Sequence, residues 1–132
     1  LRQSEVERLL SEPVVDLDEV RMAAQRAKVM GDLQTASALY ERYFEERKDP
    51  HPLNLGDYAD VLARMGRVEH ALESVNSALS AVDSDDLDQR AVLLEKRAWI
   101  RELSGDDVGA EADRRELREV ANQIKIRTRS GK

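Results

Sequence analysis

The stretch LGDYADVLARMGRVEHALESVNSA, residues 55–78, decides the fold of this chain. Two apolar stripes at helical spacing flank Gly66, with Ala59 seven residues before this glycine and Ala71 five residues after it. The same offsets recur around Gly31 and Gly105, which lie 35 residues before and 39 residues after Gly66. A pattern that returns every 30–40 residues or so indicates a helical repeat.

The recurring positions have a physical reason. Two antiparallel helices can approach to about 8–10 Å only where the side chains at the crossing are small. Each glycine is therefore expected to turn the chain between two helices that cross at a pair of alanines. The three expected pairs are Ala24 with Ala36, Ala59 with Ala71, and Ala98 with Ala110.

Turn signals divide the chain into segments. Residues 1–12 predict a short flanking helix that ends at Glu12-Pro13, because the residue before a proline avoids the helical region. Prolines at 50 and 52 and an acidic break at 83–86 separate repeats over 17–50, 52–84 and 87–123. The basic segment 124–132 is expected to fray, and the repeats to form one domain over 17–123.

Composition favours helix and excludes several classes of function. The 132 residues are 41% hydrophobic, 36% charged and only 4% aromatic, with no cysteine. The net charge is −6, and the last nine residues hold four bases, which leaves 17 basic against 27 acidic residues elsewhere. Such an acidic body disfavours general nucleic-acid binding. No apolar run approaches the roughly 20 residues of a membrane span, so we expect no membrane insertion.

The sequence carries no signal that specifies a cellular compartment. The absence of cysteine is compatible with reducing and oxidising compartments. The chain opens Leu1-Arg2-Gln3 without an apolar signal segment, so a cytoplasmic location is the default expectation. We also expect a piece of a longer protein.

No catalytic centre, cofactor or metal site is expected. His51 and His70 have no nucleophile or ligand partner at a recognisable spacing. The acids between Asp83 and Asp88 lack the glycine and glutamate that a calcium loop requires at its sixth and twelfth positions. Acids also favour the positive end of a helix, which explains this cluster better.

Taken together, the repeated offsets resemble the tetratricopeptide repeat (TPR) family over residues 17–123. The resemblance implies an all-α fold: a right-handed α-solenoid of three antiparallel helix hairpins, with a flanking N-terminal helix and a basic C-terminal tail. Three arginines, Arg97, Arg101 and Arg114, stand where the family places apolar residues, which predicts imperfect packing or a water-facing end in the third repeat.

The resemblance further implies a protein–protein interaction scaffold that holds a partner's peptide or helix in a concave groove. By position, the groove would be lined by Arg21, Met22, Gln25, Lys28, Asp57, Asp60, Arg64, Val92, Lys96, Trp99 and Leu103. The alternative is a structural module that self-associates or continues into a longer repeat array without a peptide ligand.

Two features of the groove refine these expectations. Asp57 stands where the family's chaperone-binding members carry an asparagine that holds a terminal carboxylate, so a carboxylate clamp is disfavoured. Trp99 is the only tryptophan and has two interpretations, burial beneath a flanking segment or anchoring of a ligand. The N-terminal helix could dock on the repeats or end a preceding unit, and the basic tail could bind an acidic partner.

Overall fold

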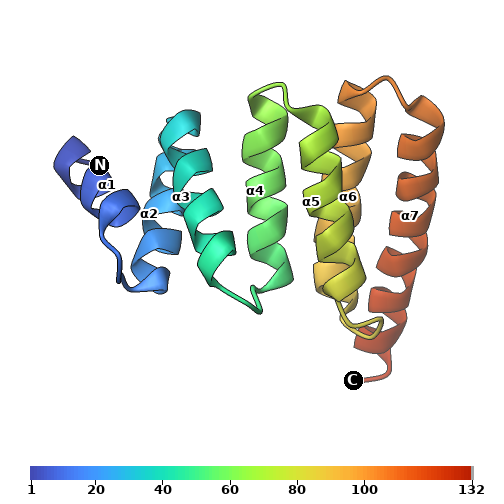
Figure 1. Ribbon diagram of the computed structural model, residues 1–132. Helices are drawn as coiled ribbons and strands as arrows, with labels where there is room; N and C mark the ends of the chain where they lie inside the picture. The colour runs from blue at the N-terminus through green and yellow to red at the C-terminus, as the bar shows by residue number, and fades with distance from the viewer. Residues whose placement is uncertain (132) are drawn as a thin grey trace. The chain divides into compact units, whose positions relative to one another are not determined.

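The computed structural model describes residues 1–131, which form seven α-helices and no strand (Figure 1). The helices are α1 (Gln3–Ser11), α2 (Leu17–Val29), α3 (Leu33–Glu46), α4 (Pro52–Arg64), α5 (Val68–Ala81), α6 (Leu87–Leu103) and α7 (Asp107–Arg129). The all-α class expected from the sequence is confirmed. None of the helices described is long and apolar enough to span a membrane.

The helices fall into two compact units, and each is described by itself. The first contains α1 to α3 and ends at His51, and the second begins at Pro52 and contains α4 to α7. The boundary lies in Pro50-His51-Pro52, where neither proline can donate a backbone hydrogen bond. It lies next to residue 50, where the first predicted repeat ends.

Three identical turns join α2 to α3, α4 to α5 and α6 to α7. Gly31, Gly66 and Gly105 have φ values of 81°, 83° and 83°, in the left-handed region that glycine adopts without strain. After each glycine, the next amide donates to a carbonyl five residues back, as in Asp32 N to Ala27 O at 2.9 Å. This is the Schellman arrangement, which satisfies the last carbonyls of a helix. The glycine spacing in the sequence therefore marks the same turn three times.

Aspartates begin four of the helices. The carboxylates of Asp16, Asp32, Asp86 and Asp106 accept hydrogen bonds from backbone amides of the first turns of α2, α3, α6 and α7. At α7 the acceptor oxygen lies 2.8 Å from the amide nitrogen of Gly109. A Cβ at position 109 would lie 2.1 Å from the other Asp106 carboxylate oxygen. The absence of a side chain at Gly109 thus leaves room for the Asp106 carboxylate that caps α7. This cap offsets the weakening of the first turn that a glycine is otherwise expected to cause.

The helices on either side of each glycine pack against each other, α2 on α3, α4 on α5 and α6 on α7. All six alanines of the predicted crossings are buried, none more than 2% exposed. Large apolar residues surround them, with Leu39 and Tyr40 buried in the first unit and Leu62, Leu93 and Ile100 in the second. Burial of each large apolar side chain contributes roughly 1.5–3 kcal/mol, so these contacts supply most of the driving force for folding.

The N-terminal helix α1 packs against α3 within the first unit. Val6 and Leu9 of α1 are buried. Arg42 of α3 donates to the backbone carbonyl of Leu9 at 2.6 Å and also to that of Glu12. It therefore satisfies carbonyls that the end of a helix leaves without partners. Ser4 and Glu7 have the spacing of a capping box, but α1 begins at Gln3 with Arg2 as its N-cap and no side-chain cap.

The expected fraying from residue 124 is wrong for the part of the tail that the structure describes. Helix α7 continues through Ile124 to Arg129, and Lys132 lies outside the described residues. No glycine or proline interrupts 110–130. Arg127 also donates to the backbone carbonyl of Asp85 at 2.8 Å, which ties the end of α7 to the loop before α6.

Candidate functional site

Helix α6 presents an exposed apolar row. Val92, Trp99 and Leu103 are 44%, 36% and 50% exposed, and we call them the α6 row. Their spacings of seven and four residues place them on one side of a helix. In the described part of the second unit, the other exposed large apolar residues are Val108 and Ile126, both on α7. The second unit therefore gathers most of its exposed apolar side chains on one face of α6.

An ion-paired cluster lies between α4 and α6. The Lys96 ammonium donates to the carboxylate of Asp60 and lies 4.0 Å from an oxygen of Asp57. The Lys96 and Asp60 side chains are only 19% and 12% exposed. A buried charge is tolerated when it is paired and hydrogen-bonded, and removal of one partner is costly. Lys96 is therefore a structural bridge, and not simply a contact for a ligand.

Gly56 allows α4 to approach α6. A Cβ at this position would lie 2.8 Å from Cδ2 of Leu93 and 3.4 Å from Cδ of Lys96. The first distance is shorter than real Cβ contacts, so a side chain here would force the buried Leu93 side chain or one of the two helices to shift. The stem of Lys96 thus lies along α4, and its ammonium reaches Asp60 one turn further on.

The predicted groove residues fall into two groups. Seven lie in the second unit, where Asp57, Asp60 and Lys96 are in contact, the α6 row shares one face, and Arg64 is exposed in the last turn of α4. The remaining four, Arg21, Met22, Gln25 and Lys28, are on α2 in the first unit. The continuous groove across both groups stays a prediction.

On α2, the predicted residues are partly engaged with one another. The Arg21 guanidinium donates to the side-chain oxygen of Gln25 at 3.5 Å and lies 3.8 Å from Asp18. Met22 is exposed and borders a shallow depression of about 320 Å³, together with Gln25, Arg26, Val29 and Met30. This depression is an apolar patch on the first unit.

Comparisons of the chain with protein-family models, curated proteins and solved structures give no significant match. The resemblance to the TPR family therefore stays a prediction from the residues. The function is therefore inferred from the geometry within each of the two units.

Trp99 is neither buried nor fully exposed. With 36% of its surface accessible, it is not covered by a flanking segment in the way that one of its two interpretations requires. Its neighbours along the chain, Ala98 and Ile100, are buried in the core. Trp99 thus lies on a well-packed part of α6, and part of its indole ring remains accessible for contact with a partner.

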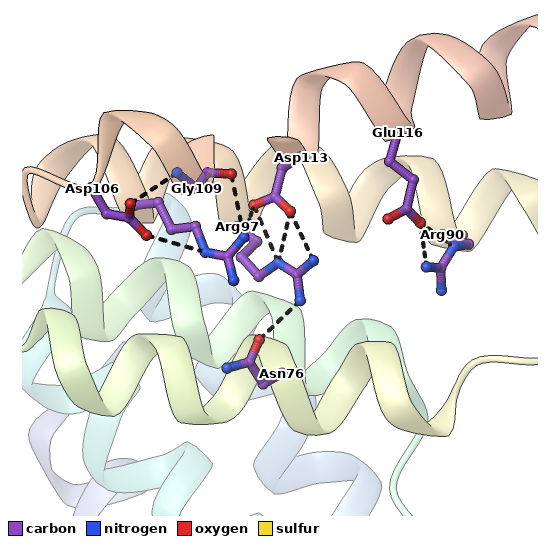
Figure 2. A network of polar contacts seen from close by, with 8 residues as sticks. Asn76, Arg90, Arg97, Asp106, Gly109, Asp113 and Glu116 are labelled. Atoms are coloured by element: carbon purple, nitrogen blue, oxygen red, sulfur yellow. Dashed lines mark hydrogen bonds and ion pairs between the residues drawn. The ribbon is translucent and has the colours of Figure 1, made fainter. Parts of the chain in front are cut away.

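A charged network between α6 and α7 was not anticipated as such. Asp113 of α7 is 2% exposed and accepts hydrogen bonds from Arg97 at 2.7 and 3.0 Å, while Arg101 lies 3.0 Å from its second oxygen. Arg97 also donates to the side-chain oxygen of Asn76 on α5 (Figure 2). Two arginines at unexpected positions of the third repeat therefore share one buried carboxylate.

Two further ion pairs join the same helices. Arg90 donates to Glu116, and Arg114, the third of the unexpected arginines, pairs with Glu102 (Figure 2 shows the first pair). Charge on both sides of the α6–α7 contact replaces part of its apolar packing, because only Ala110, Asp113 and Val120 of α7 are buried. The sequence signal that could have revealed this is the i, i+4 spacing of Arg97 and Arg101 opposite an acid on the next helix.

His70 and the acidic segment, which were candidates for catalysis or metal binding, contact other groups of the fold. His70 of α5 is exposed, and its ring meets Tyr58 edge-on at 5.6 Å between centroids. In the acidic segment, Asp86 caps α6 and the Asp85 carbonyl accepts from Arg127. Within residues 1–131, no three His, Asp or Glu side chains gather closely enough to hold a metal ion.

Proposed function

We propose that this protein is a non-enzymatic interaction module that binds a peptide or helix of a partner protein on the face formed by α4 and α6. The observation that carries the proposal is the partly exposed Trp99 in the α6 row. Tryptophan is enriched among residues that dominate binding energy, because its large rigid surface is buried at little entropic cost. Val92 and Leu103 extend the apolar contact on either side of it.

The polar border of this face supports the same function. Lys96 and Asp60 are already paired, so a ligand that covers them leaves no unpaired charge behind. The stem of Lys96 lies close to Gly56 and its ammonium is held by Asp60, which reduces the side-chain entropy lost on binding. The Lys96 side chain is thus already ordered before a partner binds.

The proposal includes a finer description of the fold as a right-handed, TPR-like α-solenoid of three helix hairpins. Three features support it: the three identical glycine turns, the six buried alanines, and the close approach of α4 to α6 at Gly56. In such a fold the first helix of each hairpin lines the concave side. In the second unit, these first helices are α4 and α6, which carry the proposed face.

Self-association is the second candidate function. It is favoured by the other apolar patch, where Met22 and Val29 of α2 and the C-cap residue Met30 are 53%, 87% and 68% exposed. Exposed apolar patches often mark protein–protein contacts. A stable dimer that covers this patch or the α6 row would serve a structural role without a peptide ligand.

A peptide display library tests the binding function. Selection on the wild-type chain is expected to enrich peptides that bind with a change in Trp99 fluorescence. The Trp99→Ala variant should lose this binding, whereas Val108→Ser, which removes an 85%-exposed apolar side chain from α7, should retain it. Selected peptides that bind Trp99→Ala as well as wild type would refute the assignment of this face.

Sedimentation analysis separates the two candidates. A mass that stays monomeric across concentrations favours a peptide-binding module. A dimer that dissociates on Trp99→Ala or Met22→Ser substitution would instead establish self-association. The Val108→Ser variant again serves as the control for loss of an exposed apolar group.

A further inference from the structure

The α6 row is bordered by a row of carboxylates. Asp88, Glu95 and Glu102 are all exposed and lie seven residues apart, and we call them the acidic row. We infer that the α6 row binds an amphipathic partner helix whose apolar stripe is edged by lysine or arginine. This inference rests on the proposed binding function and specifies the chemistry of its ligand.

The geometry of α6 places the two rows side by side. At about 100° per residue, the acidic row lies within about 60° of Trp99 on one side of the helix. Lys96 lies about 60° away on the other side, where it is engaged by Asp60. The apolar stripe thus has carboxylates along one edge and a closed ion pair along the other.

The three carboxylates of the acidic row differ in their surroundings. Glu102 is paired with Arg114 of α7, and Asp88 borders the same depression as Arg127 of α7. Within residues 1–131, neither Asp88 nor Glu95 forms an ion pair. A partner with cations along its edge therefore gains attraction chiefly at Glu95, whereas an acidic edge meets like charges. Charges at the border of an interface determine the sign of the charge that a preferred partner carries, more than they determine its total affinity.

The occupant suggested by the spacing is a helix. The α6 row extends from Val92 to Leu103, which are 11 steps apart along the helix, or about 16 Å and three helical turns. A helix laid along it would present apolar residues at i, i+4 and i+7, the pattern by which helices bind grooves. Basic residues one position outside this stripe would face Asp88 and Glu95.

Three synthetic peptides test the inference. The first two are helix-stabilised, share one apolar stripe and differ only in having Lys or Glu along its edge. The third is a scrambled form of the Lys peptide without a stripe, which measures unspecific attraction to a chain of net charge −6. Binding is followed by peptide fluorescence anisotropy and by Trp99 emission, at low and physiological salt.

We expect the Lys-edged peptide to bind on the order of tenfold more tightly than the Glu-edged peptide, with a difference that shrinks as salt rises. Glu95→Lys should remove most of this preference. Glu73→Lys makes the same charge change at an exposed position of α5 and should leave the preference intact. Circular dichroism and thermal melting of each variant establish that the fold is unchanged.

The possible failures are distinguishable. A Glu-edged peptide that binds as tightly as the Lys-edged one, and still requires Trp99, overturns the charge preference and leaves the binding function standing. Equal binding of the scrambled peptide, or no binding of either striped peptide, overturns the inference as well. Striped-peptide binding that is unaffected by Trp99→Ala removes both the inference and the assigned face.

Discussion

Arg97 of α6 and Asp113 of α7 form a two-point contact in the interior of the second unit. Two guanidinium nitrogens donate to one carboxylate oxygen at 2.7 and 3.0 Å, and Arg101 approaches the other oxygen at 3.0 Å. The carboxylate is 2% exposed. One buried acid thus holds two arginines, and its removal would leave both without their shared partner.

Asp113→Ala is therefore expected to lower the free energy of unfolding by about 3–5 kcal/mol, because it leaves two partly buried cations uncompensated. Urea denaturation of the variant measures this loss. Glu116→Ala provides the matched control, since it breaks the Arg90–Glu116 pair, which is 30% and 36% exposed. A pair of this exposure contributes at most about 1 kcal/mol, and equal losses in the two variants would contradict the special role of Asp113.

Gly56→Ala is expected to destabilise the second unit, although alanine is the better helix former by about 1 kcal/mol. The new Cβ would lie 2.8 Å from Leu93 Cδ2, and such overpacking costs about 1–3 kcal/mol. Denaturant midpoints of Gly56→Ala, Leu93→Ala and the double variant give the coupling free energy between positions 56 and 93. The double variant should lose less than the sum of the two single losses; additive losses would mean that the contact is absent.

Arg42→Ala is expected to release α1 without unfolding the rest of the first unit. The guanidinium of Arg42 holds the carbonyls of Leu9 and Glu12, and α1 is only nine residues long. An isolated helix of this length is unstable in water. Hydrogen exchange should show loss of protection in α1 and retained protection in α3. Arg47→Ala, at an exposed arginine after α3, should leave α1 protected.

Lys96→Met is expected to reduce stability by about 1–3 kcal/mol, because Asp60 loses the ammonium that compensates its burial. Thermal or urea unfolding measures the effect. Arg64→Met, at an exposed position of α4, should change the stability by no more than about 0.5 kcal/mol. Addition of Asp60→Asn to Lys96→Met should recover part of the loss. A fully stable Lys96→Met variant would mean that Lys96 is a surface group.

The sequence predicted the helices because the signals that set them are local. Gly31, Gly66 and Gly105 impose their turns through backbone conformation, and Asp16 and Asp86 begin helices through hydrogen bonds two or three residues away. These effects depend on the spacing of residues along the chain, and the same spacing recurs in each of the three repeats. Helices α2 and α6 consequently begin at Leu17 and Leu87, the first residues of the first and third predicted repeats.

The candidate site was only partly predictable, because its contacts join residues far apart in sequence. The resemblance implied Val92, Trp99 and Leu103 as groove residues, and helical spacing places them on one face of α6. By contrast, Lys96 was expected to face a ligand, but it pairs with Asp60, 36 residues away. Arg97 likewise stands at an apolar position of the repeat pattern, and only the placement of Asp113 explains it. Such pairings depend on how helices dock, which one sequence does not specify.

The glycine turns have a consequence for chemical synthesis of this chain. A Cβ built at Gly31, Gly66 or Gly105 would meet no atom within 4 Å, so the obstacle to an ordinary side chain there is handedness and not space. A mirror-image residue prefers the φ values of about +80° found at these positions. D-Alanine at all three sites should therefore raise the melting temperature by restricting the unfolded chain, whereas L-alanine should lower it.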